Sequence, residues 1–301
     1  RFRVNFFQQL NGISAVFRTI PSVIMSAEEL GIPYHQIEMT TADTEVTPMD
    51  LGSYASRVTF IAGNAVKRAA ADAKEQMRAA AADLLEAAAE DIMFENGFAS
   101  VQSAPDVKAT IQEVVEHNFN HVEGIPIVGR GAYNPQTDRL DRETGIGNTS
   151  PAYSFGAQVA EVEVNLESGH VKVIRMSSAV DCGVAINPTA VEGQVEGSVS
   201  GGIGQALMEG FYAVDGLMLN PSLLEYRLPQ VTDMPEMETI IVETREEEGP
   251  YGAKGVGEFV QIPTAAAVAN AVYDAIGVRI HDLPITPDKV MAALGKKRNS
   301  A

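Results

Sequence analysis

Residues 188–207 combine a strict apolar repeat with a row of glycines, and few folds accommodate both on one helix. Apolar residues recur at every fourth position, namely Val191, Val195, Val199, Ile203 and Leu207. Beside them runs a row of glycines, namely Gly193, Gly197 and Gly201. Glycine inside a helix costs about 0.5–1 kcal/mol relative to alanine. The row therefore needs a close neighbour, either a second helix or a ligand lying against the backbone.

The start of this helix is marked by Asn187 and Pro188, which have the order expected of an N-cap and a first helical residue. The charges of Glu192 and Glu196 exclude the small-residue packing used by paired membrane helices. We therefore expect a helix within a water-facing domain.

The rest of the chain alternates irregularly between helical and extended patterns, which predicts an α+β (mixed α/β) fold. We expect further helices at residues 21–31, 58–91, 105–117, 263–276 and 287–294. We expect strands at residues 1–10, 37–41, 160–164, 171–175, 221–228 and 239–244, and a hairpin around residues 96–97. A long loop without periodicity, residues 124–153, indicates two α/β lobes at residues 1–123 and 124–301. The first carries the long alanine-rich helix.

Composition excludes several classes of protein. The formal net charge of −18 over 301 residues would repel nucleic acid and anionic membranes. Cys182 is the only cysteine, so this chain contains no internal disulfide or cysteine cluster, and we expect a reducing, cytoplasmic location. No apolar run reaches the roughly 18 residues that a membrane span needs. The five histidines are scattered, so a zinc hydrolase site is not expected.

A glycine-rich stretch at residues 249–258 reads Gly-Pro-Tyr-Gly-Ala-Lys-Gly-Val-Gly-Glu and ends at Glu258. Such dense glycine lets another group approach the backbone closely. If the loop buries Glu258 over a ligand, desolvation raises the pKa of its carboxyl towards the range of a general base. A mobile surface turn whose glutamate caps the next helix is the alternative, and the stretch alone favours it.

A second loop, from Gly52 to Arg57, precedes the long alanine-rich helix. It has the components of an anion site, since it offers backbone N–H groups, two hydroxyls, a helix N-terminus and a guanidinium group. A simple N-cap with a solvated Arg57 explains the same residues equally well.

Three ordered motifs, at residues 50–57, 193–207 and 252–258, resemble the C-terminal half of the molybdenum-binding large subunit of the xanthine dehydrogenase/aldehyde oxidase family. The resemblance extends over residues 23–294. The run from Gly52 to Phe60, and the absence of glutamine at Gly201, look closest to the 4-hydroxybenzoyl-CoA reductase alpha subunit.

The resemblance implies a molybdenum held by a molybdopterin in its cytosine dinucleotide form, with no metal ligand from a side chain. It implies that Glu258 is the catalytic acid/base, acting as a base in hydroxylating members and handling protons during ring reduction in the dehydroxylating branch. It also implies a set of cofactor-binding residues, namely Gly52, Ser53, Tyr54, Ala55, Ser56, Arg57, Gln194, Gly202, Gln205, Lys254, Gly255, Val256 and Gly257.

The resemblance further implies partners. The family's large subunit has an N-terminal half that supplies the other wall of the cleft, and iron–sulfur clusters and FAD lie on partner subunits of a hetero-oligomer. Residues 11–17 depart from the family, because Asn-Gly-Ile-Ser-Ala-Val-Phe stands where a Gly-Gln-Gly turn is usual. Two hypotheses follow: the cofactor-binding part of an oxidoreductase acting on an aromatic, N-heterocyclic or aldehyde substrate, or a non-catalytic fragment or subunit that needs partner chains to hold the cofactor.

Overall fold

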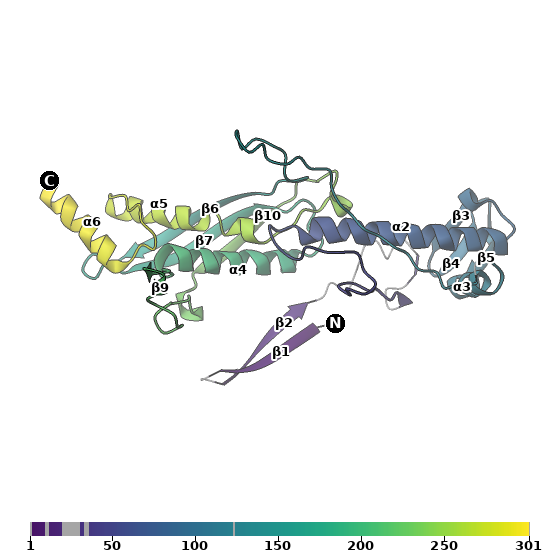
Figure 1. Cartoon of the computed structure of the whole chain (residues 1–301), viewed down its shortest axis with the longest axis horizontal. Coiled ribbons are helices and arrows are strands. Elements are labelled where there is room, and N and C mark those ends of the chain that lie inside the picture. Colours follow the sequence, from purple (N-terminus) through teal and green to yellow (C-terminus); the bar gives the residue numbers. More distant parts are fainter. Residues whose placement is uncertain (1, 10–11, 20–30, 33–35, 123, 301) are drawn as a thin grey trace. The chain divides into compact units, whose positions relative to one another are not determined.

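The computed structural model describes residues 2–9, 12–19, 31–32, 36–122 and 124–300, and the chain divides into two compact units (Figure 1). The first comprises Arg1–Gly52 and Val58–Pro151, and the second comprises Ser53–Arg57 and Ala152–Ala301. The division thus falls after Pro151 and not after residue 123. The short segment Ser53–Arg57 belongs with the second unit, which the sequence did not predict.

The long loop belongs to the first unit because it packs along helix α2 (Val58–Leu84). The backbone N–H of Arg130 donates to Asp72 at 2.8 Å, and the Gln76 side chain donates to the carbonyl of Val128 at 3.0 Å. At Gly129, a Cβ atom would lie 2.1 Å from a carbonyl oxygen of α2. The backbone of the loop therefore lies directly on the helix.

The rest of the first unit is a small antiparallel sheet with a short helix. Strands β3 (Ile92–Glu95), β4 (Phe98–Val101) and β5 (Ala104–Thr110) pair in sequence order, and α3 (Ile111–His117) follows, continued by a π-helical turn over Asn118–Val122. The core of this unit joins these elements to the end of α2 through Ala80, Ala81, Ile92, Ala99, Val101, Ala109 and Val114. Strands β1 (Phe2–Gln9) and β2 (Gly12–Thr19) form a separate antiparallel hairpin.

The second unit is built on a three-stranded sheet in the order β10-β7-β6. Strands β6 (Phe155–Val164) and β7 (Val171–Asp181) are antiparallel, and β10 (Glu236–Val242) runs parallel to β7. Helices α4 (Pro188–Leu207), α5 (Thr264–Ile276) and α6 (Pro287–Ser300) complete the unit, with a two-stranded ribbon of β8 (Ala213–Val214) and β9 (Leu217–Met218). Short 3-10 turns lie at Val231–Asp233, Pro250–Gly252 and Glu258–Val260.

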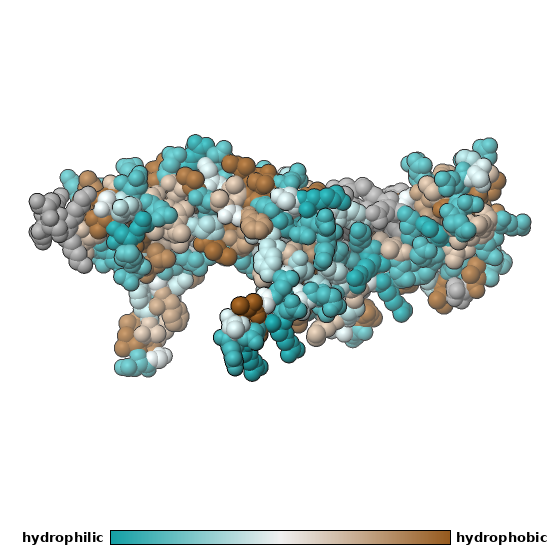
Figure 2. Space-filling view, turned by 90° about the horizontal axis from the view of Figure 1, so that it is seen from above, coloured by the Kyte–Doolittle hydropathy of each residue, from teal (hydrophilic) through white to brown (hydrophobic). Residues whose placement is uncertain are grey.

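The core of the second unit lies between this sheet and its helices. Valines and isoleucines of α4 and α5 meet the inward side chains of β7, and the fully buried members include Met176, Val180, Val195, Val199, Ile203, Val268 and Val272. Hydrophobic and hydrophilic residues are interspersed on the face that Figure 2 shows. No helix in the described part of the chain is long and apolar enough to cross a membrane.

The mixed α/β class is confirmed, as are the hairpin at Asn96-Gly97, the hairpin of β6 and β7, the glycine-rich helix with its Asn187 N-cap, and α5. Other expectations about the secondary structure were wrong. Residues 37–41 and 221–228 contain no strand, and residues 105–110 form β5 instead of the first half of a helix. The helix predicted at residues 21–31 falls almost wholly on residues 20–30, outside the described part.

Local hydrogen bonding explains the differences at residues 105–110 and 221–228. Thr110 and Glu113 form a capping box that starts α3 at Ile111 and leaves the preceding residues free to pair with β4. The backbone N–H of Tyr226 bonds the carbonyl of Ser222 at 2.8 Å, which turns the chain where a strand was expected. The long helix ends at Leu84 and not at residue 91, and Glu86 follows with a left-handed φ of 48°.

The glycines of α4 have two kinds of environment. A Cβ atom at Gly202 would lie 2.3 Å from Cβ of Thr264, so α4 and α5 pack there with almost no space between them. At Gly193 and Gly197 a Cβ atom would meet nothing within 4 Å in the part of the chain that the structure describes. Close helix packing therefore accounts for Gly202 and not for Gly193 and Gly197.

We expect Gly202→Ala to lower the free energy of unfolding by about 1–3 kcal/mol, because the added methyl group overpacks the contact with Thr264. The matched control Gly197→Ala should raise it by about 0.5–1 kcal/mol, because that position is open and alanine favours the helix. Urea unfolding followed by circular dichroism measures both. Equal effects of the two substitutions would contradict this account of the packing.

Candidate functional site

Two loops of the second unit meet at the carboxylate of Glu258. Its Oε1 atom accepts a hydrogen bond from the backbone N–H of Ala55 at 3.1 Å. Its Oε2 atom accepts from the backbone N–H of Ser56 at 2.8 Å and from the Ser56 hydroxyl at 3.1 Å. These donors lie more than 200 positions earlier in the sequence. The predicted anion-binding loop and the predicted acid/base therefore form one site.

The backbone of the first loop explains why its donors converge. Ala55 and Ser56 both have left-handed φ angles, 51° and 55°, which are uncommon for residues with a side chain. Successive N–H groups in such a turn can point at the same anion. A hydrogen bond from the N–H of Arg57 to the carbonyl of Tyr54, at 3.2 Å, closes the turn, and the Arg57 guanidinium lies 5.1 Å from the centre of the Tyr54 ring.

One glycine of the second loop is required by this contact, and a second lies close to it. A Cβ atom at Gly255 would lie only 1.4 Å from the carbonyl oxygen of Ser56, so no other residue fits there without moving a loop. A Cβ atom at Gly257 would lie 3.1 Å from Oγ of Ser56 and 3.7 Å from Oε1 of Gln194. The small size of these glycines therefore lets the two loops lie close together, and Gln194 of α4 lies beside Gly257.

Helix α4 contributes one direct support. The hydroxyl of Ser198 donates to the carbonyl of Gly257 at 3.0 Å, immediately before Glu258. Gln194 is exposed one turn earlier on the same helix. Gly202 and Gln205 lie about 12 Å and 16 Å further along, from the rise of 1.5 Å per residue. Gly202 is buried against α5, whereas Gln205 is exposed.

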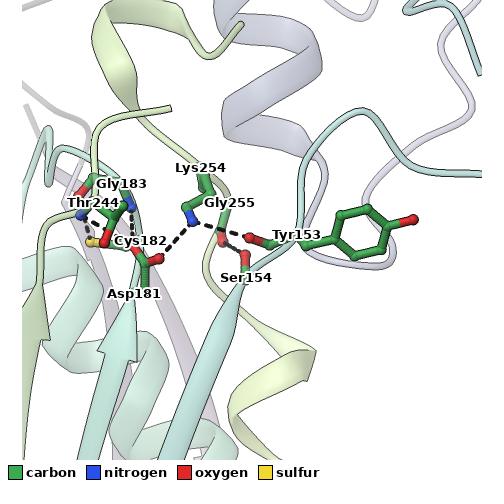
Figure 3. Close-up of polar contacts among 8 residues, drawn as sticks. All are labelled: Tyr153, Ser154, Asp181, Cys182, Gly183, Thr244, Lys254 and Gly255. Carbon is green, nitrogen blue, oxygen red and sulfur yellow. Dashed lines mark hydrogen bonds and ion pairs between the residues drawn. The ribbon is translucent and has the colours of Figure 1, made fainter. Parts of the chain in front are cut away.

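Lys254 points into the protein, towards Asp181 (Figure 3). Its Nζ atom lies 2.7 Å from Oδ2 of Asp181, at the end of β7, and donates to the carbonyl of Tyr153 at 3.0 Å. The two side chains of this ion pair are only 5% and 9% exposed. The structure therefore gives Lys254 an internal partner, while its predicted contact with a cofactor stays a prediction.

The environment of Glu258 differs from the expected dry pocket, because the residue is exposed. Hydrogen bonds from its own backbone N–H, from Ser56 and from Ala55 outweigh the opposing effect of burial and lower the pKa of the carboxyl from the usual 4.5. A raised pKa was expected only if the loop buried Glu258, and that condition is not met in the arrangement observed. The carboxylate is stabilised in its ionised form.

The remaining predicted residues have varied surroundings. Gly52, Ser53 and Tyr54 are exposed, Arg57 is half-buried, and Val256 packs against the core.

Asp181 and Ser198, which fix the glutamate loop, were not predicted as site residues. Asp181 lies 73 positions before Lys254, so no local sequence pattern indicated this pair. The described residues contain no group of three or more His, Cys, Asp or Glu side chains that could hold a metal ion.

Comparison with known proteins shows the family to which the chain is similar. The molybdopterin cofactor-binding domain family matches residues 20–235. The chain is 34% identical to the xanthine dehydrogenase molybdenum-binding subunit of Escherichia coli O157:H7, over 88% of this chain and 34% of that protein. It is 36% identical to the nicotine 6-hydroxylase large subunit of Paenarthrobacter nicotinovorans, over 89% of this chain and 33% of that protein. The chain thus spans about a third of the length of these relatives.

Solved structures show the same similarity. Quinoline 2-oxidoreductase from Pseudomonas putida 86 has a TM-score of 0.69 and 31% identity, over 81% of this chain and 31% of that one. Reconstituted CO dehydrogenase from Oligotropha carboxidovorans has a TM-score of 0.76 and 25% identity, over 98% of this chain and 37% of that one.

We expect Ser56→Ala to raise the pKa of the Glu258 carboxyl while leaving it below 4.5, because one of its donors is lost and the backbone donors remain. Since the folded-state pKa is lowered, these hydrogen bonds stabilise the fold above pH 4.5, and the contribution is lost as pH falls through the folded-state pKa. Carboxyl ¹³C NMR titration measures the shift. Ser53→Ala, which changes an exposed neighbouring serine, should leave the titration unchanged.

Proposed function

Because this chain belongs to the molybdopterin cofactor-binding domain family, we propose that it forms the cofactor-binding part of a molybdenum-dependent oxidoreductase with Glu258 as its acid/base. The observation that carries the proposal is the convergence of the Ala55 and Ser56 donors on an exposed glutamate carboxylate. This arrangement presents an ionised base at the surface of a rigid loop.

The described residues fit a bound pterin cofactor. Gly193 and Gly197 leave one face of α4 without side chains, and nothing in the described part of the chain lies within 4 Å of their open positions. Gln194 is exposed beside them and can donate and accept hydrogen bonds. The N–H groups of Ala55 and Ser56 already bond Glu258, but the Ser53 hydroxyl and the Arg57 guanidinium of the same loop suit the anionic groups of a dinucleotide. This loop, Gln194 and Gln205 are therefore the residues that would hold the cofactor.

The chemistry divides between the cofactor and the chain. When bound, the molybdenum cofactor supplies the oxidation–reduction chemistry. Glu258 accepts a proton at its carboxylate and returns it later, and its lowered pKa keeps the proton-accepting form populated near neutral pH. The Ala55 and Ser56 donors hold the carboxylate in place, so a weakening of these bonds makes it a stronger base.

We propose hydroxylation of an aromatic, N-heterocyclic or aldehyde substrate as the reaction. The similarity to the nicotine 6-hydroxylase large subunit and to quinoline 2-oxidoreductase favours an N-heterocycle. Reductive dehydroxylation, as in the 4-hydroxybenzoyl-CoA reductase branch, is the second candidate. The run Gly-Ser-Tyr-Ala-Ser-Arg-Val-Thr-Phe at residues 52–60 favours it.

The assembly is part of the proposal. Because the chain spans about a third of its relatives, we propose that the N-terminal half of a molybdenum subunit completes the cleft. Iron–sulfur and FAD subunits would accept or supply electrons, and the pterin would carry a cytosine dinucleotide, in a cytoplasmic hetero-oligomer. A non-catalytic subunit that keeps this architecture is the alternative.

We expect molybdenum and pterin to co-purify with the chain when the rest of the molybdenum subunit and its partner subunits are co-expressed. Metal analysis and fluorescence of the oxidised, released pterin measure this content. Measuring the chain alone in parallel shows whether it retains cofactor by itself. Metal-free protein under both conditions would contradict the enzyme proposal and leave the non-catalytic one.

We expect Glu258→Gln to lower kcat of the assembled enzyme by about 10²–10⁴-fold, because the amide cannot accept the proton. Cofactor content should stay at the wild-type level, since the amide keeps the side chain's size. Glu163→Gln, which removes the same charge at an exposed position of β6, is the control and should leave kcat unchanged. Retained activity in Glu258→Gln would remove the acid/base assignment.

A further inference from the structure

We propose that the buried pair of Asp181 and Lys254 is a positioning device that sets the location of Glu258, and that Lys254 acts through this pair instead of touching the cofactor. The inference rests on the proposed function only in taking Glu258 to be the acid/base. The geometry that carries it belongs to the second unit alone.

The Asp181 carboxylate is held by backbone hydrogen bonds in addition to its ion pair with Lys254. Its Oδ1 atom accepts hydrogen bonds from the backbone N–H of Gly183 at 3.0 Å and of Thr244 at 3.3 Å, so it joins the ends of β7 and β10. Its Oδ2 atom is left for Lys254 (Figure 3). The anchor therefore belongs to the rigid sheet and not to a flexible loop.

The backbone around Lys254 is tied to the same place. Its N–H donates to the carbonyl of Cys182 at 2.7 Å, and Gly183 and Ala253 form an isolated antiparallel bridge. The Nζ atom also lies 5.4 Å from the centre of the Phe155 ring, and Phe155 begins β6. Side chain and backbone of Lys254 thus both connect the loop to the sheet.

The position of Lys254 is transmitted to Glu258 along a short, constrained segment. The carbonyl of Gly255 accepts from the Ser154 hydroxyl at 3.3 Å, and the carbonyl of Gly257 accepts from the Ser198 hydroxyl at 3.0 Å. Between them, Val256 packs against the core. Each residue from Lys254 to Gly257 therefore has a fixed partner, and Glu258 emerges in one orientation towards Ala55 and Ser56.

The energetics favour a positioning role over a stabilising one. A buried ion pair gains little net stability over well-packed apolar residues, because both charges lose their water, whereas removing one partner is strongly destabilising. The sheet also carries an exposed ion pair between Arg175 and Glu238, at 3.0 Å. A pair as dry as Asp181–Lys254 is therefore best explained by the orientation that it imposes.

The test compares the full chain carrying Asp181→Asn together with Lys254→Met against wild type. Asparagine keeps an acceptor for the N–H groups of Gly183 and Thr244, and methionine keeps the apolar stem, so no unpaired charge is buried. The control is Arg175→Met with Glu238→Gln, which removes the exposed pair. Hydrogen exchange measured by NMR, with the metal and pterin absent, reads the amides of Ala55 and Ser56 and, as an internal reference, Met176 and Val180 of β7.

We expect exchange at Ala55 and Ser56 to become about tenfold faster in the first variant, the size expected when a charge-assisted hydrogen bond is lost. The β7 amides should change less than twofold, and the control should change neither set. Unchanged exchange at Ala55 and Ser56 would overturn the proposal. So would equal losses in the loop and in β7, which a merely structural pair predicts.

If the double variant does not fold, Lys254→Arg decides, because it keeps the buried charge and changes only its geometry. Faster exchange confined to Ala55 and Ser56 supports positioning, and wild-type exchange overturns it. All these measurements use cofactor-free protein. A failure to load molybdenum would therefore contradict the proposed function and leave this result standing.

Discussion

The charge of Lys254 lies almost wholly inside the protein, and the arrangement of the second unit depends on balancing it. Asp181 can do so only because two backbone N–H groups hold its other oxygen and because β7 ends at that residue. Burial raises the pKa of Asp181, but the hydrogen bonds from Lys254, Gly183 and Thr244 outweigh it, so the pKa is lowered. The Asp181 carboxylate is therefore stabilised in its ionised form, and its contact with Lys254 joins the sheet to the loop that carries Glu258.

At the other end of that loop, hydrogen bonds to Glu258 oppose the cost of a strained backbone. Left-handed backbone at Ala55 and Ser56 costs of the order of 1–3 kcal/mol each. Hydrogen bonds to one carboxylate are charge-assisted and stronger than those to a neutral acceptor, so Glu258 offsets part of that cost. The carboxylate and the turn stabilise each other, and neither is positioned by its own sequence neighbours alone. This explains why a five-residue segment, Ser53–Arg57, belongs to a unit whose other residues begin at Ala152.

The sequence predicted those elements whose formation depends on a local residue pattern. The repeat of Val195, Val199 and Ile203 predicted the buried face of α4, and the Asn187-Pro188 order predicted its start. Predictions from these patterns were wrong where a local hydrogen bond sets the start of a helix. The capping box at Thr110 shortens the helix that was expected from residue 105. At the site, the motifs indicated which residues matter. They could not show that Lys254 points inwards to Asp181, because a partner 73 positions away leaves no local pattern.

The same limit applies to the pKa of Glu258. Glycine density predicted that another group approaches the backbone closely, and a bound ligand was one of the two interpretations left open. The structure shows that the approaching group is the carbonyl of Ser56, at a distance that only glycine at position 255 permits. That contact places the N–H groups of Ala55 and Ser56 beside the carboxylate, so hydrogen bonding lowers its pKa by more than desolvation raises it. A carboxylate held in this way is ionised, and it becomes more basic when these donors are withdrawn. The basicity of Glu258 is therefore set by the geometry of the Ser53–Arg57 turn, whose N–H groups hold the carboxylate.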